Sequence, residues 1–454
     1  MSSYGQGDAG YTSHAIDVLT TTAQELQGYL KDGSLTSKII VLLYYQQINR
    51  HNKTGAKLNA MISTAPLDQL IARATELDKE RLEGRVRSPL HGIPIIVKDS
   101  IITESSLEMA TTCGSLAGGF RKDDTFLGHS NPCGSSSGSA AGVAAGFAPS
   151  SLRTETDGSI IQPTGRNSVY GLKITVGAVS TWGTLPRSDF TDSLDPMARS
   201  VPDLASLLGI LMKKDFTKFL VESWSGQSVA FVDPYLWEAP ENARLKYLEA
   251  AALIGQKGGK VVRDADMIQY EELEVDGQPG IDVIWDHDFA QVLERFFRSF
   301  GSTSLRKLED VIIRSGERGD VNPQTRFIDA LNRGGIDHKE CEAAKRLLRA
   351  KARHAFDQIF SKQGVDLLAM PQDCRIAILA AAAGYPAGIV PLGYAPFNGR
   401  GFGLVVIAGE KQEAKILSFM SAWQATHPGL PTPPQLVEDK MEDYIVKRRR
   451  VARN

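Results

Sequence analysis

The run Ile93-Pro94-Ile95-Ile96-Val97 leads directly into Lys98 and Asp99, and it marks the point where the chain changes from helical patterns to strands. Its branched apolar residues predict a short strand buried on both faces. Lys98 would then lie at the carboxyl end of that strand. A lysine in such a place is usually at the surface. If it is desolvated, it loses proton affinity, and its neutral amine can accept a proton from a serine.

The residues before this run predict an N-terminal helical layer over residues 14–85. Apolar residues recur at three- to four-residue spacing from Ile16 to Leu30 and again from Ile39 to Ile48. This period is that of an amphipathic helix. A third helix is expected over residues 67–81.

The residues after position 202 alternate between strand and helix patterns. Alternation of this kind predicts an α/β fold with a largely parallel sheet. With no repeat or low-complexity linker in sight, we expect one domain over residues 1–454, with a core at 86–215 and a remaining α/β part at 216–454. The expected strands are 229–232, 261–262, 365–370 and 402–408, and the expected helices are 242–256, 286–299, 321–333, 338–360 and 411–425.

Composition excludes several classes of function. The 454 residues carry 51 Lys+Arg and 53 Asp+Glu, a net charge of −2, which argues against an electrostatic nucleic-acid binder. No stretch approaches the ~18 consecutive apolar residues of a membrane-spanning helix. No signal peptide is visible, and the four cysteines lack the paired spacing of a zinc site, so we expect a reduced, cytoplasmic protein without a metal. The basic run 447–450 predicts a solvated helix end or a tail, or alternatively a nuclear-import signal.

A serine- and glycine-rich segment, Cys133 to Ser139, leads into a run of small residues that predicts a closely packed helix. It formally matches the G-x-S-x-G nucleophile elbow, with Ser136 as nucleophile and Asp366 and His427 as candidate partners. An elbow needs a strong strand before it, and residues 125–132 supply none. The alternative is a turn that caps the helix.

A second turn, Thr154 to Ile160, places a glycine beside a serine. Successive backbone N–H groups in such a turn can point toward one place, which is the main ingredient of an oxyanion hole. An ordinary surface turn is the alternative.

Together these segments resemble the amidase signature family, which includes acetamidases, fatty-acid amide hydrolases and the A subunit of glutamyl-tRNA amidotransferase. The likeness covers roughly residues 20–435, and the motif sequences are most similar to those of the fungal amidase branch. It implies a large mixed, mostly parallel sheet flanked by helices. The matching stretches are Ser88–Asp99, Thr111–Ser115, Gly134–Ser139, Thr154–Gln162, Gly171–Lys173, Asp192–Ser193, Pro196–Val201, Gly384–Pro386 and Val390–Gly393.

By position, the resemblance implies a triad of Ser159 as nucleophile, Ser135 as bridging serine after a cis peptide bond, and Lys98 as base. It also implies that the N–H groups near Thr156, Asp157 and Gly158 hold the oxyanion and that Met109 lines the acyl channel. The implied activity is hydrolysis of a linear small-molecule amide through an acyl-enzyme, without a cofactor. A transamidase component is a variant that would need protein partners, and the oligomeric state stays open.

The sequence departs from the family at two kinds of place. Family members carry a longer stretch before the Gly/Ser segment, so a helix and strand near residues 116–130 would be missing here, and the alternative function is a catalytically impaired amidase-like protein. In addition, Arg153 and Asp195 stand where the family usually has glycine, and Ile174 stands where it has proline.

Overall fold

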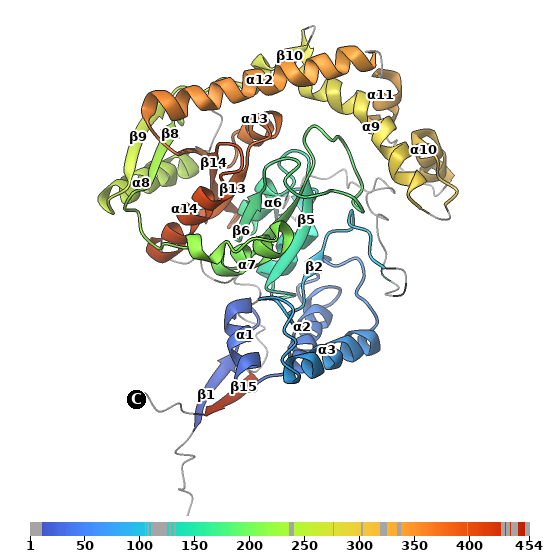
Figure 1. The fold of residues 1–454 in the computed structure, drawn as a ribbon, viewed down its shortest axis with the longest axis vertical. Coiled ribbons are helices and arrows are strands. Elements are labelled where there is room, and N and C mark those ends of the chain that lie inside the picture. The colour runs from blue at the N-terminus through green and yellow to red at the C-terminus, as the bar shows by residue number, and fades with distance from the viewer. Residues whose placement is uncertain are drawn as a thin grey trace, which may run out of the picture.

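The computed structural model describes residues 11–104, 106, 109, 125–126, 129–130, 133–235, 240–275, 277–300, 303–317, 325–333, 337–396, 398–427, 432, 436 and 444–449. Its centre is a nine-stranded mixed sheet flanked by helices, as predicted (Figure 1). The strands, in spatial order, are β2 (Ile96–Val97), β5 (Ser150–Glu155), β7 (Ser193–Ala198), β6 (Tyr170–Lys173), β13 (Ala387–Tyr394), β14 (Gly401–Ala408), β12 (Leu367–Pro371), β8 (Ser228–Val232) and β9 (Lys260–Ala265).

The prediction that this sheet is mostly parallel is wrong. Among its described strands the pairs β2–β5, β12–β8 and β8–β9 are parallel, and the other five neighbouring pairs are antiparallel. The reason lies in the connections. β13 and β14 are joined by the short loop 395–400, which is too short for the crossover that a parallel pair needs.

Two layers of helices cover the two faces of the sheet. Leu368 and Met370 of β12 pack with one layer, and Leu367 and Ala369 pack with the other, as the alternation of strand side chains requires. The first layer contains α9 (Gly280–Arg298), α12 (His338–Gln363) and α13 (Ile376–Ala383). The second contains α7 (Val201–Met212), α8 (Glu241–Gln256) and α14 (Glu413–Thr426). Figure 1 shows α12 crossing the top of the view above α13, from the side of β9 to the side of α11.

The predicted N-terminal helical layer is present as α1 (Ala23–Lys31), α2 (Ser37–His51) and α3 (Leu67–Leu82). The Asp203 carboxylate of α7 accepts the N–H groups of Ala23 and Gln24 and so fastens α1 to the sheet layers. Four strands of the central sheet, β5, β6, β7 and β13, were not predicted. Neither were β1 (Tyr11–Ile16) and β15 (Tyr444–Arg449), which pair antiparallel beside these helices (Figure 1). The basic run therefore lies largely in a strand, not in a helix end or tail.

The remaining elements are short or peripheral. The structure contains α5 (Ser137–Ala144), α6 (Ile161–Arg166), α10 (Leu308–Glu317), α11 (Thr325–Arg333), two 3-10 turns, η2 (Thr217–Phe219) and η3 (Tyr270–Glu272), and the two-residue strands β3 (Thr125–Phe126), β4 (His129–Ser130), β10 (Glu274–Val275) and β11 (Gln278–Pro279). Most of the region around 116–130, where a segment is predicted to be missing, lies outside the described residues.

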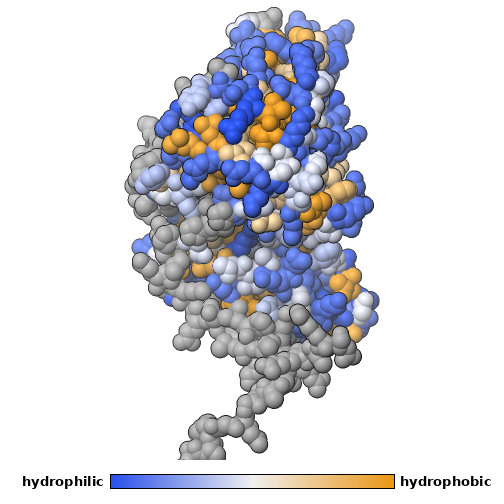
Figure 2. Space-filling view, turned by 90° about the vertical axis from the view of Figure 1, so that its left-hand side faces the viewer, coloured by the Kyte–Doolittle hydropathy of each residue, from blue (hydrophilic) through white to orange (hydrophobic). Residues whose placement is uncertain are grey.

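In the described part of the chain, no helix has both the length and the apolar character to cross a bilayer. Figure 2 shows hydrophobic side chains on one face as separate patches among hydrophilic ones. Cytoplasmic location and the division into a single domain stay predictions.

Candidate active site

Lys98 follows β2 directly, and its N–H continues the ladder by donating to the Leu152 carbonyl oxygen at 3.0 Å. Its Nζ atom lies 2.7 Å from Ser135 Oγ and 3.2 Å from the Thr154 carbonyl oxygen. Burial, and secondarily the positive charge of Arg153, lower the pKa of Lys98 to about 7. A large fraction of the amine is therefore neutral at neutral pH, which is the form that can accept a proton.

Ser135 lies in the turn just before α5, and the Gly134–Ser135 peptide bond is cis. The Ser135 Oγ atom lies between two partners, because it is 2.7 Å from Lys98 Nζ and 3.2 Å from Ser159 Oγ. Its N–H also points at Ser159 Oγ, at 3.4 Å. The three side chains thus form a continuous path along which a proton can move from one serine to the other and then to the amine.

Ser159 lies in the turn between β5 and α6. Gly158, which precedes it, has φ of +67°, a left-handed conformation that glycine adopts without steric cost. The Glu155 carboxylate, at the end of β5, accepts the N–H groups of Ile160 and Ile161 and so anchors the start of α6. In the described part of the chain, the N–H groups of residues 157–159 donate to no other group, so they are available to an oxyanion.

The same turn is held on its other side by Asp192. Thr156 Oγ1 donates to Asp192 Oδ1 at 2.6 Å, and Asp192 Oδ2 accepts the N–H groups of Arg187 and Ser188 at 2.7 and 3.0 Å. Burial raises the pKa of the Asp192 carboxyl, and these hydrogen bonds oppose the rise. Asp157 projects from the turn itself, and burial followed by the charge of Glu155 raises its pKa to about 7.

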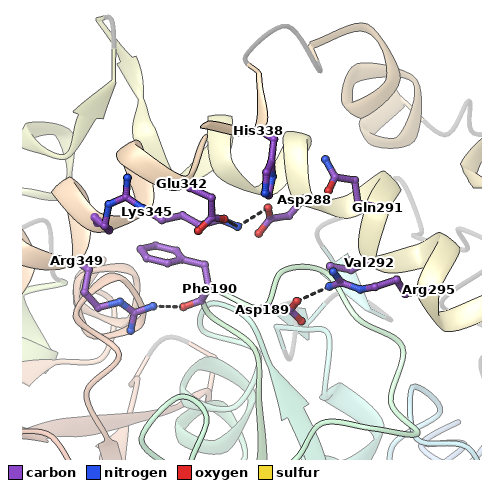
Figure 3. A pocket seen from close by; sticks show the side chains of 11 residues that line it. Asp189, Phe190, Asp288, Gln291, Val292, Arg295, His338, Glu342, Lys345 and Arg349 are labelled. Carbon is purple, nitrogen blue, oxygen red and sulfur yellow. Dashed lines mark hydrogen bonds and ion pairs between the residues drawn. The ribbon is translucent and has the colours of Figure 1, made fainter. Parts of the chain in front are cut away.

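The loop before β7, which contains Arg187 and Ser188, also borders a cavity of about 380 Å³. This cavity lies between the loop residues Asp189 and Phe190 on one side and the helices α9 and α12 on the other (Figure 3). Asp288 lines the cavity, and its carboxylate accepts a hydrogen bond from the Ser188 hydroxyl. The same carboxylate forms a 2.7 Å ion pair with the Lys345 ammonium group. Hydrogen bonds therefore connect the Ser159 turn, through Asp192 and Ser188, with the wall of the cavity.

Among the described residues, one group of side chains brings three potential metal ligands within 4.8 Å of one another: His287, Asp288 and Cys341. The ligand set does not suit a metal ion well. Lys345 already neutralises Asp288, and burial, together with Asp288, raises the pKa of the Cys341 thiol to about 12. A metal ion would have to displace both the ammonium group and the thiol proton.

The structure brings together six of the residues that the resemblance points to: Lys98, Ser135, Thr156, Asp157, Gly158 and Ser159. Met109 is half-buried, and its place in an acyl channel stays a prediction. Sequence reasoning missed the supporting roles of Glu155 and Asp192. A signal was available, because both acids lie within stretches that match the family pattern, Thr154–Gln162 and Asp192–Ser193, and a buried carboxylate must find hydrogen-bond donors.

The nucleophile-elbow hypothesis is not supported by the geometry. Ser136 is buried, and its Oγ atom has no hydrogen-bond partner among the described residues. The Asp366 carboxylate is bound by Ser228 and Lys415, and the His427 ring stacks on Trp423. The three residues thus do not form the hydrogen-bonded series that an elbow enzyme requires.

Comparison with known proteins identifies the family. The amidase family profile matches residues 40–125 and 127–379. An amidase-family protein of Schizosaccharomyces pombe is 29% identical over 90% of this chain and 85% of its own length, and the A subunit of the glutamyl-tRNA(Gln) amidotransferase of Lactobacillus delbrueckii is 25% identical over 88% and 95%. The crystal structure of the peptide amidase from Stenotrophomonas maltophilia superposes with a TM-score of 0.80 and 27% identity, covering 91% of this chain and 98% of that one. The chain therefore belongs to the amidase family.

Proposed function

We propose that this protein is an amidohydrolase that cleaves the C–N bond of a linear carboxamide through a Ser159–Ser135–Lys98 triad and an acyl-enzyme. The observation that carries the proposal is the unbroken path from Ser159 Oγ to Ser135 Oγ, at 3.2 Å, and on to Lys98 Nζ, at 2.7 Å. The pKa of Lys98, about 7, favours the neutral amine that such a path requires.

The first step is acylation. Neutral Lys98 accepts the Ser135 proton while Ser135 accepts the proton of Ser159, and the Ser159 oxygen attacks the amide carbonyl carbon. The N–H groups of residues 157–159 hold the oxygen of the tetrahedral intermediate. As that intermediate collapses, the proton returns from Lys98 by way of Ser135 to the leaving nitrogen, and an amine or ammonia departs. An ester between the acyl group and Ser159 remains.

The second step is hydrolysis of this ester. A water molecule replaces the departed amine and gives a proton to the Ser135–Lys98 pair as it attacks the acyl carbon. The carboxylic acid leaves, and Ser159 regains its proton. No step needs a metal or an organic cofactor, because the lysine supplies the acid–base function and backbone N–H groups supply the electrostatic stabilisation.

The alternative, a catalytically impaired amidase-like protein, is not favoured. It is based on the segment predicted to be missing near residues 116–130, yet in this chain the three side chains of the proposed triad lie within hydrogen-bonding distance of one another. Likeness to a peptide amidase makes peptide amides a suitable first substrate class. Short aliphatic amides and fatty-acid amides complete the panel.

The test is the intact mass of the protein after incubation with a fluorophosphonate, which reacts with activated serines. We expect one adduct on the natural chain and none on Ser159→Ala, while Ser136→Ala, its matched control, still reacts. A folded natural chain that forms no adduct and hydrolyses no amide of the panel would reject the proposal and leave the impaired protein as the better account.

A further inference from the structure

Two of the departures from the family pattern face each other across the sheet. In the antiparallel register of β5 and β7, Arg153 pairs directly with Asp195. Both side chains are fully buried. Directly opposed residues of neighbouring strands have their side chains on the same side of the sheet, with Cβ atoms about 5 Å apart. The two side chains therefore lie on the same side of the sheet, and the charge of Asp195 favours the charged form of Arg153.

Lys98, the proposed base, lies in line with the Arg153–Asp195 pair. β2 and β5 run parallel with Val97 opposite Leu152, and the N–H of Lys98 bonds the Leu152 carbonyl. One step further along this register, Lys98 lies beside Arg153. Lys98, Arg153 and Asp195 thus occupy one line across three adjacent strands.

The hydrogen bonds in this row are unequally distributed. The Asp195 carboxylate accepts from the Ile174 N–H and from the Ser193 hydroxyl, both at 2.8 Å. None of the three guanidinium nitrogens of Arg153 has a hydrogen-bond partner among the described residues. An arginine that only braced the strands would use its five donors. Arg153 therefore acts on its neighbours mainly through its positive charge, because Coulomb interactions are strong in the low-dielectric protein interior.

The charges around Lys98 act in opposite directions. Arg153 on β5 disfavours a second positive charge at the Lys98 amine, whereas Glu155 on β5, Asp192 before β7 and Asp195 on β7 favour one. Asp195 and Glu155 in turn stabilise the Arg153 guanidinium, whose pKa burial lowers to about 9. The arginine and the aspartate should therefore have opposite effects on the lysine.

We propose that Arg153 is a positioning residue of the amidase reaction: its buried guanidinium, balanced across the sheet by Asp195, keeps the Lys98 amine uncharged and so able to accept the Ser135 proton. Its role in turnover rests on the proposed function. The charge state of Lys98, however, can be measured without any turnover.

The experiment is a pH titration of the full chain carrying ¹³C-labelled lysine, followed by NMR, with the Lys98 signal assigned by its loss in Lys98→Met. We expect the natural protein to titrate at a pH of about 7. In Arg153→Met the midpoint should rise by about one pH unit, and in Asp195→Asn it should fall below that of the natural protein. Arg153→Lys, the matched control, keeps the charge and should stay near the natural value.

A merely structural role would lower the melting temperature of these variants without moving the Lys98 midpoint in opposite directions. If Arg153→Met does not fold, Asp195→Asn still decides, because a midpoint that is unchanged or higher in that variant overturns the inference. Shifted midpoints in a protein without amidase activity would reject the proposed function and leave the electrostatic role of Arg153 intact. Amidase activity together with unchanged midpoints would reject the electrostatic role of Arg153 and leave the proposed function intact.

Discussion

The Thr156 hydroxyl donates a 2.6 Å hydrogen bond to the Asp192 carboxylate, which at the same time accepts two N–H groups of the neighbouring loop. This contact joins the turn that carries Ser159 to residues some thirty positions further along the chain. Because the N–H groups of the turn must point at one oxygen atom, a fixed turn is a condition for the proposed reaction.

Loss of the Thr156 hydroxyl should therefore slow the reaction without unfolding the protein. In Thr156→Val the Asp192 carboxylate loses one donor and the turn loses its anchor, so we expect kcat to fall by about 10- to 100-fold. Thr156→Ser keeps the hydroxyl and should retain most of the activity. Steady-state kinetics on an amide found with the substrate panel would measure both, and equal rates for valine and serine would argue against an anchoring role.

The nucleophile itself should be indispensable. We expect Ser159→Ala to lower kcat by about 10³-fold or more, since the serine, its bridge and its base act as a unit. The melting temperature should change little, because Ser159 lies in a turn and its loss leaves no large cavity. Turnover close to that of the natural chain in this variant would exclude Ser159 as the nucleophile.

The pH dependence follows from Lys98. Because burial lowers its pKa to about 7, the amine is neutral above this pH and protonated below it. As base, it must be neutral, so kcat/KM should decline about tenfold for each pH unit below 7. A pH–rate profile measured in buffers of constant ionic strength provides the check. A flat profile from about pH 5 to pH 8 is the contradictory result.

Two neighbouring leucines of α12 test the packing of the helical layer. Leu348 is fully buried in the core between α12, α9 and the sheet, whereas the adjacent Leu347 is 61% exposed. Leu348→Ala should reduce the free energy of unfolding by about 2–5 kcal/mol, because it leaves a cavity. Leu347→Ala, the matched control, should change it by less than about 1 kcal/mol. Urea unfolding followed by circular dichroism measures both, and similar losses would mean that α12 is not packed as described.

Local patterns in the sequence predicted most helices and several strands correctly. The expected helix over 338–360 is α12, at His338–Gln363, and the expected strand over 402–408 is β14, at Gly401–Ala408. Such elements can be predicted because apolar spacing reflects which face of a helix or strand is buried. The family resemblance pointed to Lys98, Ser135 and Ser159 because their motifs are local in the chain.

Other features depended on residues far apart in the sequence. The antiparallel pairing of most of the central sheet and the β1–β15 ribbon were not predicted, because strand order and direction arise from tertiary packing and not from local periodicity. The opposition of Arg153 and Asp195 is the clearest case. Sequence alone showed two charged residues in place of glycines, and only the register of β5 against β7 showed that the two face each other in the protein interior.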